Sequence, residues 1–154
     1  MKTSRSSPRW FNYTGSIALL FTVISATAQV SGDPRESILG EWTTAGGRSK
    51  VLIFKYQNEY CGKIVWIRDS LKAGKPVVDD KNPDAKLVNR PVMGIVFLKG
   101  FAFDEENVWR GGEIYDPESG NTYSAKMTLV DERTLELRGY VGIPLFGRTE
   151  AWNR

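Results

Sequence analysis

Apolar and polar residues alternate along most of the chain after residue 38, in short runs separated by turn residues. In the run 121–130, Tyr123, Ala125, Met127 and Leu129 share one face, and polar residues such as threonine, serine and lysine occupy the other. A repeat of two places successive side chains on opposite faces of a strand, so one face is buried and the other is solvated. No stretch carries a 3.6-residue repeat of helix length. The pattern predicts an all-β domain.

Turn residues divide this region into short strands. The segment Asp116-Pro117-Glu118-Ser119-Gly120 fits a hairpin loop, because proline presets φ and glycine accepts a positive value. Turns at this spacing are typical of a meander that closes into a single antiparallel up-and-down barrel. We expect eight strands, at 39–44, 50–57, 60–67, 91–99, 107–115, 121–130, 133–141 and 145–153.

One connection is much longer than the others. Residues 68–90 form a polar segment that contains Gly74, Pro76 and Pro83. Loops longer than about 12–15 residues inside a compact domain are usually functional or disordered. This segment is therefore the expected functional loop, with a plain solvated loop as the alternative.

The first 28 residues differ in composition from the rest. Basic residues come first, an apolar run follows at 17–24, and Ala26-Thr27-Ala28 ends the segment. This order is typical of a secretory signal peptide that is cleaved before Gln29. The apolar run is too short to cross a hydrocarbon core about 30 Å thick, so a retained anchor is the weaker alternative.

We therefore expect three parts in the chain. Residues 1–28 are the expected signal peptide, residues 29–37 a flexible leader and residues 38–154 the β-barrel domain. After cleavage the protein is expected to be periplasmic or extracellular, without a stable membrane span.

The charge of the chain changes when this first segment is set aside. Three of the 21 basic residues lie in it, which leaves 18 basic residues against 18 acidic ones. A nucleic-acid-binding domain carries a dense basic stripe, whereas here the two signs alternate. We expect no nucleic-acid partner.

Histidine is absent, and Cys61 is the only cysteine. The absence of histidine excludes imidazole ligands for a metal or haem, and it excludes Ser-His-Asp and Cys-His catalysis. A lone cysteine in an exported domain is either buried and inert or pairs between molecules. Because Cys61 lies within an expected strand, we expect a buried thiol.

Gly40 and Trp42 stand on the first expected strand, and Arg154 ends the last. In a closed meander these strands pair, so the guanidinium of Arg154 can stack on the indole of Trp42, a contact worth about 0.5–2 kcal/mol. We expect these three residues to close one end of the barrel, with a ligand contact by Trp42 as the alternative. The arrangement resembles the lipocalin or calycin superfamily, which implies a lipocalin-like barrel.

A second resemblance rests on several segments that follow one another along the domain. They are Gly40-Glu41-Trp42, Tyr60-Cys61-Gly62-Lys63-Ile64-Val65-Trp66, Asp80-Lys81-Asn82-Pro83-Asp84, Arg90-Pro91-Val92-Met93-Gly94, Gly112-Glu113-Ile114-Tyr115-Asp116-Pro117-Glu118-Ser119-Gly120-Asn121-Thr122-Tyr123, Arg138-Gly139-Tyr140-Val141-Gly142 and Phe146-Gly147-Arg148-Thr149-Glu150-Ala151-Trp152-Asn153-Arg154. In this order they resemble DUF2147, a bacterial family of unknown function. The resemblance implies an exported β-barrel domain. It brings no established activity and therefore no catalytic residues.

An arginine inside a strand is a candidate for ligand binding. Arg148 lies within the last expected strand, where a buried guanidinium is costly unless it is paired. Glu113 or Glu150 are its expected structural partners. The alternative is that Arg148, together with Arg90, faces a cavity and binds a ligand carboxylate through two hydrogen bonds.

Aromatic side chains are plentiful, and small barrels either fill their interior with such residues or leave one small cavity. The candidate ligand-binding residues are Arg148, Arg90, Tyr115, Tyr123, Trp66 and Glu113.

The long loop also carries oxygen-bearing side chains close together. Asp80, Asn82 and Asp84 lie within five residues, but the spacing lacks the glycine and the bidentate glutamate of an EF-hand loop. Asn82-Pro83 is also a common start of a turn. We expect no metal and no cofactor.

Two functional hypotheses follow. The first is a non-enzymatic binder of a small apolar or amphipathic molecule, held in a barrel cavity. The second is a protein-interaction module with a filled barrel, which would expose Val77, Val78 and Leu87 together on the long loop. An enzyme comes third, because the pair Glu113 and Tyr115 indicates no reaction.

Overall fold

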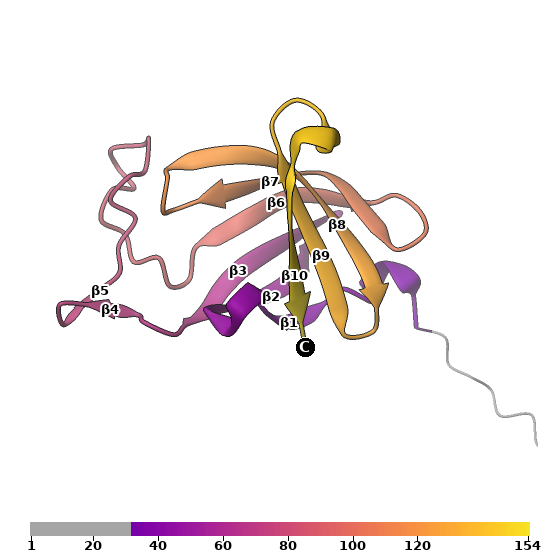
Figure 1. Cartoon of the computed structure of the whole chain (residues 1–154), viewed down its shortest axis with the longest axis horizontal. Helices are drawn as coiled ribbons and strands as arrows, with labels where there is room; N and C mark the ends of the chain where they lie inside the picture. Colours follow the sequence, from indigo (N-terminus) through magenta and orange to yellow (C-terminus); the bar gives the residue numbers. More distant parts are fainter. Residues whose placement is uncertain (1–31) are drawn as a thin grey trace, which may run out of the picture. The chain divides into compact units, whose positions relative to one another are not determined.

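The computed structural model describes residues 32–154, and these residues form a closed antiparallel barrel (Figure 1). Each barrel strand pairs with the next one along the chain, and the last pairs with the first. The predicted single all-β barrel is confirmed. The barrel strands are β1 (Gly40–Thr43), β2 (Ser49–Tyr56), β3 (Glu59–Ile67), β6 (Val96–Phe103), β7 (Val108–Asp116), β8 (Asn121–Asp131), β9 (Thr134–Tyr140) and β10 (Arg148–Asn153).

Short elements complete the described part of the chain. A small hairpin of β4 (Leu71–Lys72) and β5 (Lys75–Pro76) lies inside the long connection, where Ala73 and Gly74 both have positive φ angles. Two consecutive positive φ values are what a two-residue hairpin turn of type I′ requires. The remaining elements are the 3₁₀ turns η1 (Pro34–Glu36), η2 (Ala45–Gly47) and η3 (Pro144–Phe146).

The fourth strand lies further along the chain than the sequence predicts. We expected it at 91–99, and it spans Val96–Phe103. Pro91 has no N–H to donate to a sheet, and Gly94 has a φ of 90°, so an extended strand cannot run through these positions. The strand instead continues through Gly100, whose φ of 74° accompanies a shift in the register with β3.

The last strand is also shorter than expected. It begins at Arg148 and not at residue 145, because Pro144–Phe146 form a 3₁₀ turn. Residues 141–147 are therefore a connection, and the side chains of Leu145 and Phe146 lie exposed on it.

The meander gives the barrel two different ends. The connections 44–48, 68–95, 117–120 and 141–147 lie at one end, which we call the loop end. The short turns at 57–58, 104–107 and 132–133 lie at the other end, which we call the plug end.

Large apolar side chains fill the interior of the barrel. Trp109 packs edge-on against Tyr60 and Phe103, with ring centroids 6.1 and 5.2 Å apart. Phe97 reaches Trp152 across the interior at 6.3 Å. The buried apolar cluster consists of Ile38, Trp42, Val51, Ile53, Tyr60, Ile64, Val92, Ile95, Phe97, Leu98, Phe101, Trp109, Ala125, Met127, Leu129, Leu135, Leu137 and Trp152.

The predicted contact among Gly40, Trp42 and Arg154 closes the plug end. The guanidinium of Arg154 lies 4.3 Å from the ring centroid of Trp42, and the indole N–H of Trp42 donates to the carbonyl of Ile38 at 2.8 Å. Arg154 also donates to the carbonyls of Ser37 and Leu39. Gly40 has a φ of 115°, which side chains disfavour, so glycine suits this position. These contacts hold the segment before β1 against the barrel.

The expected signal peptide at 1–28 and the first part of the expected leader lie outside the described residues. Part of the remaining leader is ordered, because Asp33 caps η1 by accepting a hydrogen bond from the backbone N–H of Arg35. Among residues 32–154, no helix is long and apolar enough to cross a membrane.

Candidate functional site

Asp79 is the one charged side chain that is fully buried among residues 32–154. It lies in the long connection at the loop end. Its backbone N–H donates to the carbonyl of Arg90 at 2.9 Å, and the next pair along, Val78 and Pro91, forms an isolated β-bridge. The two ends of the polar part of the loop are therefore held together at Asp79.

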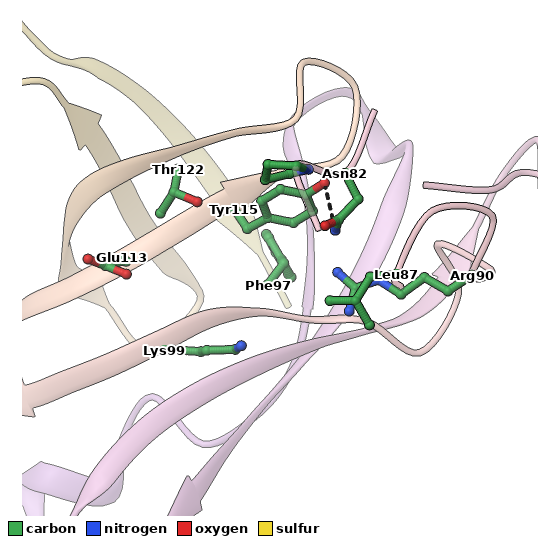
Figure 2. Close-up of a pocket in the computed structure, with 9 residues that line it drawn as sticks. Asn82, Leu87, Arg90, Phe97, Lys99, Glu113, Tyr115 and Thr122 are labelled. Carbon is green, nitrogen blue, oxygen red and sulfur yellow. Dashed lines mark hydrogen bonds between the residues drawn. The ribbon is translucent and has the colours of Figure 1, made fainter. Parts of the chain in front are cut away.

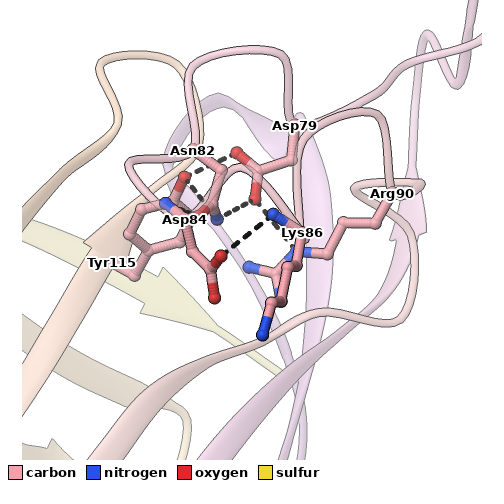
Figure 3. Close-up of polar contacts among 6 residues, drawn as sticks. All are labelled: Asp79, Asn82, Asp84, Lys86, Arg90 and Tyr115. Carbon is pink, nitrogen blue, oxygen red and sulfur yellow. Dashed lines mark hydrogen bonds and ion pairs between the residues drawn. The ribbon is translucent and has the colours of Figure 1, made fainter.

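Three side chains donate hydrogen bonds to the carboxylate of Asp79 (Figure 3). The hydroxyl of Tyr115 on β7 donates at 2.5 Å, the amide of Asn82 at 2.7 Å and Nε of Arg90 at 3.0 Å. The amide of Asn82 also donates to the hydroxyl of Tyr115 at 3.1 Å. We call these four residues the Asp79 network. It joins the long loop to the wall of the barrel.

The Asn82-Pro83-Asp84 motif shapes the loop around this network. The side-chain oxygen of Asn82 accepts from the backbone N–H of Asp84, and a carboxylate oxygen of Asp84 accepts from the N–H of Lys86, both at 2.9 Å. Such turns are the usual role of asparagine and aspartate in loops. No group of three or more acidic or cysteine side chains within the described residues is placed to hold a metal ion.

Asp79 is ionised and Tyr115 is neutral at neutral pH. Burial opposes ionisation of Asp79, but the hydrogen bonds from Tyr115, Asn82 and Arg90, with the charge of Arg90, outweigh it and lower the pKa of this carboxyl. Burial and the hydrogen bond to Asp79 raise the pKa of Tyr115 to about 12. At neutral pH the tyrosine is therefore a donor to an ionised carboxylate.

A pocket of about 190 Å³ opens beside the Asp79 network (Figure 2). Its apolar wall includes Leu87 from the loop and the ring of Phe97 from β6, and its cationic groups are Arg90 and Lys99. Typical sites for drug-sized ligands measure about 300–1,000 Å³, so this space fits a small molecule or one part of a larger one. The lining residues are Asn82, Pro83, Leu87, Arg90, Phe97, Lys99, Glu113, Tyr115 and Thr122.

Arg90 belongs both to the network and to the pocket. Its Nε donates to Asp79, and its guanidinium lies 5.8 Å from the ring centroid of Tyr115. Within residues 32–154 its two Nη groups make no hydrogen bond, and the side chain is 33% exposed. In Figure 2 the side chain extends toward Phe97 and Tyr115. One edge of the guanidinium is thus held in place while the other is free for a ligand.

The structure brings together three of the six ligand-binding candidates. Arg90, Glu113 and Tyr115 line this pocket. Trp66 on β3 and Tyr123 on β8 are not among its lining residues, and Trp66 is 41% exposed.

The alternative in which Arg148 faces a cavity is wrong. Its side chain is 86% exposed and lies 3.7 Å from a carboxylate oxygen of Glu150. Arg148 is the first residue of β10 and not an interior one, since the preceding residues form η3. The expected structural pairing with Glu150 is therefore present, at the rim of the barrel.

The prediction that Val77, Val78 and Leu87 are exposed together is also wrong. Val77 packs against the core, and its carbonyl accepts from the N–H of Val92. Val78 pairs with Pro91, and Leu87 lines the pocket. Val77 and Val78 are thus half-buried while Leu87 stays 37% exposed, and the most exposed apolar side chains of the loop end are Val141, Leu145 and Phe146 on the connection 141–147.

Sequence reasoning missed Asp79, Phe97 and Lys99. Asp79 and Asp80 are adjacent in the sequence, and nothing in the pattern distinguishes the buried one from the exposed one. Phe97 and Lys99 lie within both the expected strand 91–99 and the observed β6. Their spacing of two residues places them on one face of the strand, and this is the signal that could have found them.

Residues 40–154 match the model of a family described as an uncharacterized protein conserved in bacteria (DUF2147). Among solved structures, the chain is similar to protein HP1028 of Helicobacter pylori, described as belonging to the lipocalin family. The identity is 26%, the TM-score is 0.67, and the match covers 75% of this chain and 81% of that one.

A redesigned β-barrel is a weaker structural match, with 14% identity, a TM-score of 0.45 and coverage of 79% of this chain and 94% of that one. No curated protein matches the sequence significantly. The family and the lipocalin-like fold that the sequence indicates are both confirmed.

Proposed function

We propose that this chain, which belongs to the DUF2147 family of bacterial proteins, binds a small amphipathic molecule through an anionic group at the loop-end pocket. A carboxylate or phosphate of the ligand would accept from the free Nη groups of Arg90. The apolar part of the ligand would contact Leu87 and Phe97. The lipocalin-like fold supports a role in binding small molecules.

The position of Arg90 is the observation that carries this proposal. Arginine has a rigid planar group, so fixing Nε on Asp79 also orients both Nη groups. Asp79 is itself held by Tyr115 and Asn82, so little side-chain freedom is left to lose when a ligand binds. Lys99 adds a second positive charge to the same pocket, directly across from Glu113 on β7, the carboxylate among the lining residues.

The packed interior limits how the ligand can lie. Trp42, Trp109 and Trp152 fill the barrel, so a ligand would occupy the mouth of the barrel and not its axis. We propose that the protein does this outside the cytoplasm, after removal of the signal peptide that the sequence predicts at 1–28.

Octanoate and 1-octanol test the proposal, because they share an apolar chain and differ in the anionic group. We expect isothermal titration calorimetry to show octanoate binding at least about tenfold more tightly than octanol, since a charge-assisted hydrogen bond is worth about 1.5–3 kcal/mol. Equal binding of the two molecules, or no binding of octanoate, would contradict the proposal.

Variants locate the site. Lys99→Gln removes one charge from the pocket without touching the Asp79 network, and it should weaken octanoate binding several-fold. Arg110→Gln is the matched control, because Arg110 is an exposed residue whose ion pair with Asp104 lies away from the pocket. A similar loss in both variants would indicate a general effect of charge and not a site.

Native mass spectrometry of the protein purified from its bacterial host addresses the identity of the ligand. We expect an adduct that is lost in Arg90→Gln. Because that substitution leaves Asp79 buried with one donor fewer, the free energy of unfolding of the variant is measured alongside.

A further inference from the structure

The connection between β9 and β10 exposes an unusual number of apolar side chains. Its seven residues, Val141-Gly142-Ile143-Pro144-Leu145-Phe146-Gly147, include no polar side chain. We call it the apolar loop, and Figure 1 shows it projecting beyond the ends of β9 and β10. The exposed fractions are 72% for Val141, 54% for Ile143, 75% for Leu145 and 78% for Phe146. We propose that this loop docks the protein onto the surface of an anionic lipid bilayer.

Hydrogen bonds satisfy part of the backbone of the apolar loop. The N–H groups of Phe146 and Gly147 donate to the carbonyls of Ile143 and Pro144, each at 3.2 Å. Arg138 on β9 donates to the carbonyls of Pro144 and Leu145, at 2.6 and 3.1 Å. Unsatisfied backbone groups are what make a loop costly to place in hydrocarbon. This loop is therefore suited to enter the boundary between headgroups and acyl chains.

The loop also has a fixed shape. A side chain at Gly147 would lie 2.5 Å from the carbonyl of Gly139, so glycine lets the turn pack closely against β9. The hydrogen bonds from Arg138, also on β9, hold the turn as well. The apolar side chains are thus presented without the entropy cost of ordering a flexible loop on binding.

Basic side chains lie at the base of the apolar loop. Lys126 on β8 is directly opposite Arg138 on β9, and Arg148 follows the loop with its side chain 86% exposed. Like charges directly opposite each other in a sheet are destabilising, and an anionic surface would relieve that repulsion. Glu150, 3.7 Å from Arg148, is the acidic group that forms an ion pair there.

These features favour a lipid surface over a protein partner. The loop offers no side-chain donor or acceptor with which to recognise a specific protein surface. Apolar side chains flanked by arginine and lysine are the composition of segments that lie in membrane interfaces. The exposed apolar residues at the plug end, such as Tyr56 and Val130, lie on separate strands.

Flotation with vesicles tests the proposal on the full chain. We expect the protein to float with vesicles of mixed phosphatidylglycerol and phosphatidylcholine, and more weakly with phosphatidylcholine alone. Leu145→Ser/Phe146→Ser should lower the partition coefficient at least about tenfold, because partitioning scales with the apolar surface buried in the bilayer. Both residues are exposed, so the thermal unfolding of the variant should match that of the wild type.

A matched control removes apolar surface from the other end of the barrel. Tyr56→Ser/Val130→Ser carries the same residues 1–31, so any binding through that segment is equal in both variants. This control should partition like the wild type. Equal binding of both double variants would overturn the proposal, as would absence of wild-type binding or equal binding to vesicles without phosphatidylglycerol. Concentration-dependent dimerisation in solution that Leu145→Ser/Phe146→Ser abolishes would also overturn it, in favour of a second copy of the chain.

Discussion

The carboxylate of Asp79 is ionised although it is buried away from water. Hydrogen bonds from its three donors therefore take the place of hydrogen bonds to water. Three side chains share this role, and Tyr115 comes from the barrel while Asn82 and Arg90 come from the loop. Removing one donor leaves part of a buried charge uncompensated, which typically costs more than the hydrogen bond itself contributes. Each of these residues therefore affects both the stability of the loop and the placement of Arg90.

Tyr115→Phe should lower the free energy of unfolding by about 1.5–3 kcal/mol at neutral pH, measured by urea denaturation. The folded state raises the pKa of Tyr115 from 10.0 to about 12, so it favours the neutral phenol. The stability that Tyr115 contributes is complete below pH 10 and is lost as the pH rises toward 12. The difference between wild type and Tyr115→Phe should therefore shrink over that interval.

In acid, the free energy of unfolding depends on pH in the opposite direction. The pKa of Asp79 lies below its usual 3.8 in the folded state, so its contribution is present above that pH and is lost as the pH falls further. Tyr115→Phe removes one cause of that lowering, and the variant should unfold at a higher pH than the wild type. Tyr140→Phe is the control, because the hydroxyl of Tyr140 lies outside the Asp79 network. If the difference in the free energy of unfolding between wild type and Tyr115→Phe stayed constant up to pH 12, it would contradict the role assigned to the Tyr115 hydroxyl.

The long loop and the β7–β8 turn support one another as elements. Lys81 donates through its ammonium group to the carbonyl of Glu118 at 2.6 Å, and a side chain at Gly120 would collide with the backbone carbonyl of Lys81. Together with the bond from Tyr115, these contacts hold the loop over the edge of the barrel.

Gly120→Ala should loosen this loop without opening the barrel. Gly120 and Gly142 both have a φ of 75°, but a side chain at Gly142 would meet nothing within 4 Å. Both substitutions impose a similar strain of about 1–2 kcal/mol, and only Gly120→Ala adds the collision with Lys81. Hydrogen exchange should become faster in residues 79–90 in Gly120→Ala and stay unchanged there in Gly142→Ala. Equal exchange in the two variants would show that the contact does not hold the loop.

The strand pattern was predictable because alternation is local, whereas the position of β6 was not. Residues 91–99 have the composition of a strand, but Pro91 and the positive φ of Gly94 exclude its first part, and pairing with β3 selects the segment that begins at Val96. The same limit applies to the site. Arg90, Glu113 and Tyr115 were candidates as separate residues, but their meeting depends on Asp79, a residue that the sequence does not distinguish from Asp80.

At the scale of the whole molecule, closure of the barrel leaves no edge strand along its circumference. Cys61 lies on β3, between β2 and β6, and is 7% exposed. Burial also raises the pKa of the Cys61 thiol above its usual range, which reduces the reactive thiolate. Both effects make reaction at this thiol depend on opening of the barrel.

Labelling of Cys61 by a thiol reagent should therefore report global unfolding. We expect the rate to rise with urea with the same slope as the equilibrium free energy of unfolding, because no smaller opening separates β3 from both of its neighbours. Val141→Cys supplies the internal comparison, since residue 141 is exposed and its thiol should react at the rate of an unfolded chain. Labelling of Cys61 that does not depend on urea would show local opening of β3. In that case β3, the strand that leads into the long connection, would open more readily than the closed hydrogen bonding of the barrel implies.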